Sequence, residues 1–485
     1  MTRSVRRLAP RLSVAASALA ATGRSASAHT LAVTPYDLLI PFWAYVCACA
    51  ATLLLTFAVL AFAAGDTSAA TRHPRIGIAL GRVLPAVGRT AAIALFGMTV
   101  AAGLWGTPSP VANIAPTLFW VGMMLGLTVV TAVLGDVFQI VNPWHSLMRL
   151  LHVGGRPLLR YPPALAHWPA FVCYLSLAWV ELMAAPRPSL LAWALIAYTG
   201  LTAAGTALFG RDAWFGRAEL FGVFFRLVGT LAPVAYNRED TAGHRGWRAR
   251  WRPPLSGTLE DVPRHVSLLL FVLFMLAATT YDGVWRTSFW AELYWSNLMY
   301  WLRPVWGDDT ARAQALLAPG YLVYQRGGLI AAPFVYLAVY MAAMVMMRVL
   351  TGGRVTARVL ALRFAFTVIP IAFVYMLAHS WTFLLTVIPV VPFLLTDPFG
   401  AGWNLLALPL MSAEPAPLDM GQVWHMEVAL ILAGHVNSVY LAHRVALRTF
   451  PTRRQAWISE LPLLLLMMGY TFIGLTVLSL PLALH

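Results

Sequence analysis

The stretch 264-RHVSLLLFVLFMLAATTYD-282 has no charged residue between its basic start and its aspartate. Its apolar length is close to the about 20 residues that a helix needs to cross a bilayer. Inside a bilayer the backbone can satisfy its polar groups only within a helix or a closed barrel. The stretch therefore predicts a membrane-spanning helix whose polar residues lie at its two ends.

The composition of the chain extends this interpretation to the whole molecule. Of its 485 residues, 60% are hydrophobic and 11% are charged, whereas soluble domains carry about 25% charged residues. We therefore expect an all-α, polytopic transmembrane helical bundle of about ten spans, forming a single domain over residues 29–485. The expected spans are 38–64, 83–105, 114–135, 167–184, 190–209, 264–282, 328–347, 363–382, 424–443 and 461–481.

Residues 1–28 have the pattern of a secretory signal peptide. Arginines at positions 3, 6, 7 and 11 precede a short apolar stretch, and 26-ASA-28 is typical of a cleavage site. Cleavage after Ala28 makes His29 the first residue of the mature chain, on the outer side of the membrane.

The basic residues predict the orientation of the spans. The net charge is +15, yet the chain has no lysine, and its arginines lie in short loops between apolar segments. This positive-inside pattern excludes a nucleic-acid-binding face. With the mature N-terminus outside, 23 loop arginines lie inside and 5 outside. We expect a bacterial inner-membrane protein with both mature termini in the periplasm.

Two apolar segments are harder to place than the ten spans. If 213–235 crossed the membrane, the basic segment 238–252 would lie outside, so we expect 213–235 to be re-entrant or interfacial. Residues 383–395 contain Pro389 and Pro392 and are expected to form an outer-face hairpin or a bent helix extension. We interpret 236–263 as a long inner loop. Its Arg/Trp run suits an anionic lipid surface, or acts only as a topology determinant.

Ionisable residues at membrane depth are candidate functional groups, because burying them in lipid is costly. Most of those in this chain fall toward the outer face, and His435 lies near the middle of its span. The outer-face set is His29, Asp37, Glu181, Asp282, His379, Asp397, His425 and Glu427.

Histidine and carboxylate together are typical ligands of zinc or copper, and a bound metal can activate water for hydrolysis. We expect His379, Asp397 and His435 to be catalytic. The expected metal ligands are His29, Glu181, Asp282, His379 and His435. The alternative for each histidine is an interhelix hydrogen bond. His443, at the inner end of its span, is interpreted as structural.

Several segments of the chain resemble a bacterial family of polytopic membrane proteins labelled fenitrothion hydrolase. The most specific are 279-TTYDGVWRTSFW-290, 375-YMLAHS-380, 396-TDPFGAGWN-404 and 432-LAGHVNSVYLAH-443. Others are 29-HT-30, 137-VFQIVNPW-144, 160-RYPPALAHWPA-170, 178-AWVEL-182 and 209-FGRDAWFGRAELF-221. The matched polar positions are Glu181, Asp282, His379, Asp397, Trp403, His435 and His443. Met376 and Asn404 depart from the family pattern, where relatives often have histidine and aspartate.

The resemblance implies hydrolysis of a phosphotriester bond to an aryl group, with release of a nitrophenol. The leading hypothesis is thus a membrane-embedded hydrolase of lipophilic organophosphorus esters, with zinc or copper as the candidate cofactor. Two alternatives remain open. One is a transporter or copper-handling protein that uses the same residues. The other is an accessory subunit that works with a membrane partner.

Overall fold

The computed structural model describes residues 40–63, 77–184, 187–241, 244–306, 309–406 and 419–479. The expected signal peptide, His29 and Asp37 lie outside the described residues, as does the end of the chain after residue 479. The described part is mostly helical, as predicted from its composition.

Nine helices of the described chain are long and apolar enough to cross a membrane, and they coincide with nine of the ten expected spans. They establish a multi-pass membrane protein. Their elements are α2 (Phe42–Ala63), α3 (Val83–Trp105), α4 (Ile114–Pro116) continuing through π-helical turns into α5 (Leu127–Leu134), α8 (Trp168–Met183), α9 (Pro188–Phe209), α12 (Val266–Trp285), α15 (Thr310–Leu350), α16 (Ala357–Phe364) continuing into α17 (Ile369–His379), and α21 (Arg453–Ser479).

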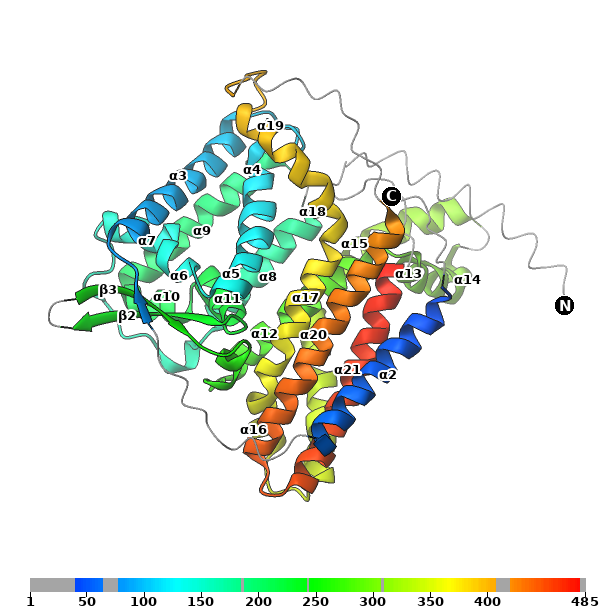
Figure 1. The fold of residues 1–485 in the computed structure, drawn as a ribbon. Helices are drawn as coiled ribbons and strands as arrows, with labels where there is room; N and C mark the ends of the chain where they lie inside the picture. Colours follow the sequence, from blue (N-terminus) through cyan, green and yellow to red (C-terminus); the bar gives the residue numbers. More distant parts are fainter. Residues whose placement is uncertain are drawn as a thin grey trace.

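The tenth expected span, residues 424–443, lies within α20 (Met420–Thr449). Its polar residues lower its hydropathy, and it is not among the nine apolar helices. It nevertheless packs against α17 and α21, beside which it runs in Figure 1. Glu427, His435 and His443 are all buried, so these three polar groups of α20 face other helices rather than lipid.

The helices form two groups that meet at α12. Figure 1 shows α3, α5, α8 and α9 on one side and α17, α20 and α21 on the other. The first described helix, α2, packs with the second group, against α20 and α21. Because α12 contacts α8, α15, α17 and α21, its apolar residues are surrounded by protein. Phe271, Val272 and Leu273 are fully buried.

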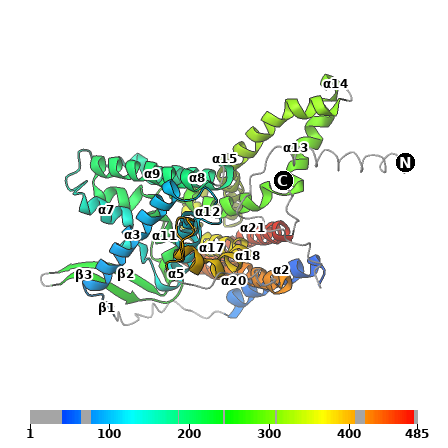
Figure 2. The ribbon, with the colours of Figure 1, turned by 90° about the horizontal axis from the view of Figure 1, so that it is seen from above.

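A helical arm projects sideways from this bundle (Figure 2). It consists of α13 (Ser288–Trp301), α14 (Arg303–Trp306) and the first part of α15. With 41 residues, α15 is about 60 Å long, roughly twice the hydrocarbon thickness of a bilayer. Tyr294, Leu317 and Tyr321 form a separate small apolar cluster within the arm.

Residues 213–235 contain no helix long enough to cross a membrane, which fits the expectation of a re-entrant or interfacial segment. They form the end of α10 (Arg211–Arg217) and α11 (Leu220–Gly229). With ten residues, α11 is about 15 Å long and too short to span a bilayer. It packs against α5, α8 and the short helix α6 (Phe138–Val141). Beyond α6 lies α7 (Pro143–Leu150).

Both ends of α11 are closed by charged side chains. At its start, Glu219 accepts hydrogen bonds from the amides of Phe221, at 3.1 Å, and Gly222, at 2.6 Å. At its end, Arg252 donates to the carbonyl oxygens of Gly229, at 2.5 Å, and Ala232, at 3.0 Å. Free backbone groups at the ends of a buried helix are costly, and these two residues remove part of that cost.

The segment expected to be a long inner loop contains a small sheet, which corrects the sequence interpretation. β1 (Gly77–Ala79), β2 (Val234–Thr241) and β3 (His244–Trp251) are antiparallel, in the order β1-β3-β2. The Arg/Trp run forms β3 because its residues alternate with the period of a strand. Arg248 and Arg250 fall on one face of the strand, and Trp247, Ala249 and Trp251 on the other.

Residues 381–396 form a bent extension of the preceding span rather than a hairpin. They comprise α18 (Trp381–Val387), a 3-10 turn and α19 (Val391–Thr396). Pro389 and Pro392 lie near the two bends, where a proline removes a helical hydrogen bond. The loop after α19 then docks onto the end of α3: Phe399 accepts from the Thr107 amide at 2.8 Å.

Candidate functional site

The structure brings Asp282 and His379 together at the C-terminal ends of α12 and α17, the ends that the arginine distribution predicts to face outward. The Oδ2 atom of Asp282 lies 2.8 Å from Nε2 of His379. Its other carboxylate oxygen, Oδ1, lies 2.9 Å from the guanidinium of Arg286 and accepts from the indole of Trp285 at 3.3 Å. The side chains of Asp282 and His379 are 19% and 23% exposed, so the pair is partly open to its surroundings.

Local structure explains how the two side chains meet. Arg286 follows Asp282 by four residues, which places both on one face at the end of α12. His379 is the last residue of α17. Gly283 lets α21 approach closely, since a Cβ atom there would lie only 2.2 Å from Val477 Cγ1.

The pair has the arrangement of an oriented acid–base group. An ionised aspartate only accepts hydrogen bonds, so Nε2 of His379 carries the shared proton. Nδ1 of the neutral ring then has a free lone pair and can take a proton from another molecule. The guanidinium of Arg286 places a positive charge beside the carboxylate of Asp282.

Glu181 lies near this pair. It lies near the C-terminal end of α8, is exposed, and interacts electrostatically with Asp282 and Arg286. Three of the expected site residues, Glu181, Asp282 and His379, therefore share one end of the bundle.

Asp397 has a different role in the structure. Its Oδ1 and Oδ2 atoms accept hydrogen bonds from the backbone amides of Ala401, at 2.9 Å, and Gly402, at 2.7 Å. Gly400 and Gly402 have positive φ angles of 64° and 84°, which glycine adopts at little cost. Asp397 thus closes the turn of the 396–404 segment.

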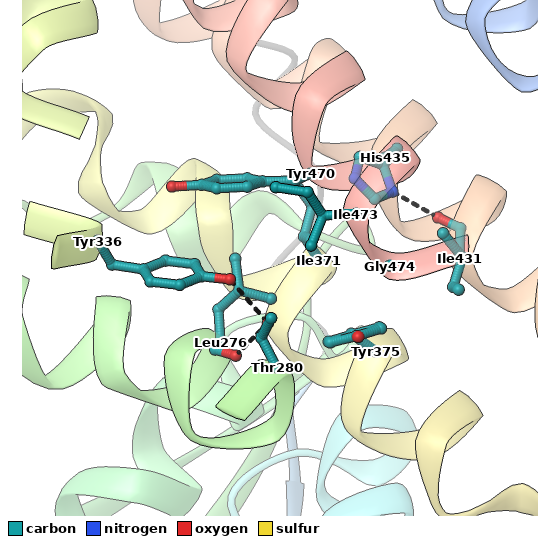
Figure 3. A pocket seen from close by; sticks show the side chains of 10 residues that line it. All are labelled: Leu276, Thr280, Tyr336, Ile371, Tyr375, Ile431, His435, Tyr470, Ile473 and Gly474. Carbon is teal, nitrogen blue, oxygen red and sulfur yellow. Dashed lines mark hydrogen bonds between the residues drawn. The ribbon is translucent and has the colours of Figure 1, made fainter. Parts of the chain in front are cut away.

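His435 is also separate from the pair. It is 2% exposed and lies in the middle of α20, where it lines an internal cavity with residues of other helices (Figure 3). The residues expected from the sequence to be catalytic are therefore distributed over three places: the Asp282–His379 pair, the turn closed by Asp397 and the centre of the bundle.

Three further polar contacts involve ionisable side chains of α20. His425 is exposed, and its Nε2 lies 3.1 Å from the Tyr45 hydroxyl. Glu427 accepts from Thr382 at 3.5 Å. Toward the C-terminal end of α20, Nδ1 of His443 lies 3.0 Å from Glu460, and both side chains are almost fully buried. This last contact agrees with the structural role expected for His443.

The sequence interpretation missed Glu219, Glu460 and the role of Arg286. Glu219 is 1% exposed and also accepts hydrogen bonds from Tyr198, at 2.5 Å, and Asn142, at 3.2 Å. A carboxylate within an apolar segment was the available signal for Glu219. Arg286 was counted only as one of the outer arginines, because its contact with Asp282 depends on where α12 ends.

The described residues contain no group of three or more His, Cys, Asp and Glu side chains placed to hold one metal ion. His379 and Asp282 supply two adjacent donors, fewer than the three protein ligands of a typical catalytic zinc site. His29 lies outside the described part of the chain. Compared with known proteins, the chain matches no family model, no curated protein and no solved structure.

Proposed function

We propose that this protein is a membrane-embedded hydrolase of lipophilic esters, with His379 as the general base and Asp282 as the group that orients it. The observation that carries the proposal is the 2.8 Å contact between His379 Nε2 and Asp282 Oδ2, with Arg286 on the second carboxylate oxygen. Organophosphorus aryl esters are the proposed substrate class, because of the sequence resemblance described above.

The proposed reaction transfers one proton and breaks one phosphorus–oxygen bond. Nδ1 of His379 takes a proton from water as the water oxygen attacks phosphorus. The bond to the aryl oxygen breaks and the aryl oxide leaves with its electron pair. The imidazolium, stabilised by Asp282, then returns the proton to the leaving group or to solvent. General base catalysis of this kind contributes about 10²–10⁴-fold in rate.

The location of the pair suits a substrate that partitions into lipid. His379 and Asp282 lie at the ends of spanning helices and are partly exposed. An apolar aryl ester dissolved in the outer leaflet would reach such a site along the bilayer, while water reaches it from the aqueous side. None of these steps requires a metal ion.

The proposal is tested by adding fenitrothion to the protein purified in detergent or nanodiscs and following nitrophenol release. We expect the native protein to release nitrophenol. The rate of release should fall about 10²-fold or more in His379→Ala. It should also fall in Asp282→Asn, because the ring of His379 is then no longer correctly oriented. His425→Asn is the matched control, because this exposed outer histidine does not contact the pair. We expect a chelator to leave the rate unchanged.

The absence of nitrophenol release, with or without added zinc, cobalt or copper, would refute the hydrolase. Release that requires a metal and survives His379→Ala would instead refute the assignment of His379 as the base.

A further inference from the structure

Three arginines from three helices lie around His145 of α7. Arg149 follows His145 by four residues, so the two side chains lie on one face of α7. The ring of Phe215 on α10 lies 5.0 Å from that of His145, measured between centroids. Arg211 precedes Phe215 by four residues, which places it on the same side of α10. The faces of α7 and α10 that meet at His145 therefore each carry an arginine.

The third arginine comes from α3. Arg89 donates from Nε to the carbonyl oxygen of Ile140, at 2.9 Å, in the short helix α6 that precedes α7. Helix α3 packs against both α6 and α7, and Figure 1 shows α6, α7 and α10 together beside it. Gly88 permits this contact, because a Cβ atom there would lie 2.8 Å from Val141 Cγ1. The three arginines therefore come from helices that pack around one place.

The positive charges at this place have no matching negative charges. Burial and the charges of the three arginines lower the pKa of His145 to about 4, and the exposed Asp212 opposes them. Within the described part of the chain, Arg89, Arg149 and Arg211 form no ion pair with a carboxylate. Like charges that are held together repel unless an anion lies between them. We call these three residues the arginine cluster, and its charge indicates an anionic ligand.

The sheet adds to this positive region. The charge of the exposed Arg238 on β2 acts on Arg89, as does that of Arg149. Nε2 of Gln139 donates to the carbonyl oxygen of Tyr236 at 3.3 Å, which joins β2 to α6. The arginine cluster is therefore bordered by a further basic side chain rather than by a carboxylate.

The source of the anion is indicated by the apolar surface beside the cluster. Arg89 is the seventh residue of α3, about 9 Å along the axis from its start, near the boundary between lipid headgroups and hydrocarbon. The same helices expose apolar side chains next to the arginines: Val83, Leu84 and Val87 on α3, and Leu150 and Leu151 at the end of α7. A soluble phosphate uses only the charges, whereas a phospholipid uses both the charges and the apolar surface.

We propose that Arg89, Arg149 and Arg211 bind the phosphate of an anionic phospholipid whose acyl chains lie along α3. Guanidinium groups bind phosphate through charge-assisted, often paired, hydrogen bonds, and basic pockets between spanning helices suit anionic headgroups. The arginine distribution predicts that this end of α3 faces the cytoplasm, so the lipid belongs to the inner leaflet. The site shares no residue with the Asp282–His379 pair and is independent of any hydrolysis.

Native mass spectrometry tests the proposal, with the protein in a neutral detergent and with phosphatidylglycerol or phosphatidylcholine of the same acyl chains. We expect phosphatidylglycerol to bind more tightly. Arg149→Gln/Arg211→Gln should weaken its binding about tenfold or more, since each basic side chain near an anionic lipid contributes about fivefold. Arg89 is kept, because its Nε bonds the backbone. Arg348→Gln/Arg358→Gln is the matched control: it removes two exposed arginines of α15 and α16.

Melting temperatures separate a lipid site from a purely structural role of the arginines. Without lipid, Arg149→Gln/Arg211→Gln relieves repulsion, so its melting temperature should equal or exceed that of the native chain. Added phosphatidylglycerol should raise the melting temperature of the native chain and of the control, but not that of the cluster variant. The same loss of stability with and without lipid would show that the arginines only support the fold, and would overturn the proposal.

The remaining outcomes decide the nature of the ligand. Inorganic phosphate at the same concentration should leave the melting temperature of the native chain unchanged. If it raised the melting temperature as much as phosphatidylglycerol does, the ligand would be a soluble phosphate and the lipid assignment would be wrong. Equal binding of the two lipids, or binding of phosphatidylglycerol that is unaffected in Arg149→Gln/Arg211→Gln, would also overturn the proposal.

Discussion

At the scale of single residues, His379 and His435 use their two ring nitrogens in opposite ways. His379 bonds through Nε2 to a carboxylate, whereas His435 bonds through Nδ1 to a backbone carbonyl. The first arrangement leaves a partly exposed nitrogen beside charged groups, and the second leaves a buried nitrogen beside tyrosines. The neighbours of each ring, contributed by distant parts of the chain, therefore determine what each histidine can do.

Asp136 carries a residue-scale prediction about pH. It lies two residues beyond the third span, and burial raises its pKa from 3.8 to about 6, against the opposing effects of the Gln139 amide and Arg226. A carboxyl whose folded pKa is raised contributes stability that is complete below the unfolded pKa and is lost as pH rises through the folded value. Asp136 therefore favours the folded protein at pH 4 and progressively less toward pH 6.

Asp136→Asn removes this titration while keeping a side-chain acceptor for Gln139. We expect the melting temperature of the variant, relative to the native chain, to rise between about pH 4 and pH 6 and to stay level above about pH 7. The Asp136→Asn variant must be compared with the native chain at each pH, because other groups also titrate in this range. Burial and Arg149 lower the pKa of His145 to about 4. Histidine titration thus acts in the same window with the opposite sign. A constant difference across the window would contradict the prediction.

At the scale of elements, α11 shows how a short helix is accommodated within a membrane protein. Burial raises the pKa of Glu219, while hydrogen bonds from Tyr198, Gly222, Phe221 and Asn142 oppose that shift. Those same bonds connect the start of α11 to α9 and to the turn before α7. The helix is thus held by polar contacts at its ends and apolar contacts along its length.

Glu219→Ala should destabilise the protein by about 1–3 kcal/mol, since it removes the cap of α11 and leaves buried donors without a partner. The control is Glu260→Ala. Glu260 is 47% exposed and forms only long ion pairs with Arg250 and Arg252, at 3.5 and 3.6 Å, and such pairs contribute about 0–1 kcal/mol. Thermal unfolding in detergent measures both. Equal effects of the two variants would show that the Glu219 contacts are not important to the fold.

At the scale of the whole molecule, the spans could be predicted from the sequence because apolar length is a local property. The stretch 264–282 proved to be the central helix. Residues 213–235, which the charge balance predicts not to cross, contain no helix long enough to do so. The meeting of Asp282 with His379 could not be predicted, because it depends on how α12 and α17 pack. The sheet was missed because a strongly basic segment was interpreted as a loop, although its residues alternate with a period of two.

The orientation of the bundle leads to a final prediction, which rests on the distribution of arginines. Single cysteines are introduced at Ala401, in the turn closed by Asp397, and at Ser256, after the sheet, in a chain whose three native cysteines are replaced by alanine. In intact spheroplasts, a membrane-impermeant maleimide should label position 401 and should label position 256 only after permeabilisation.

Both sites lie in turns at opposite ends of the spanning helices, and Ser256 follows the arginine-rich strand β3. Labelling of position 256 in intact spheroplasts would place the sheet and its arginines outside. The Asp282–His379 pair would then face the cytoplasm, and substrates of the proposed hydrolase would have to come from the inner leaflet.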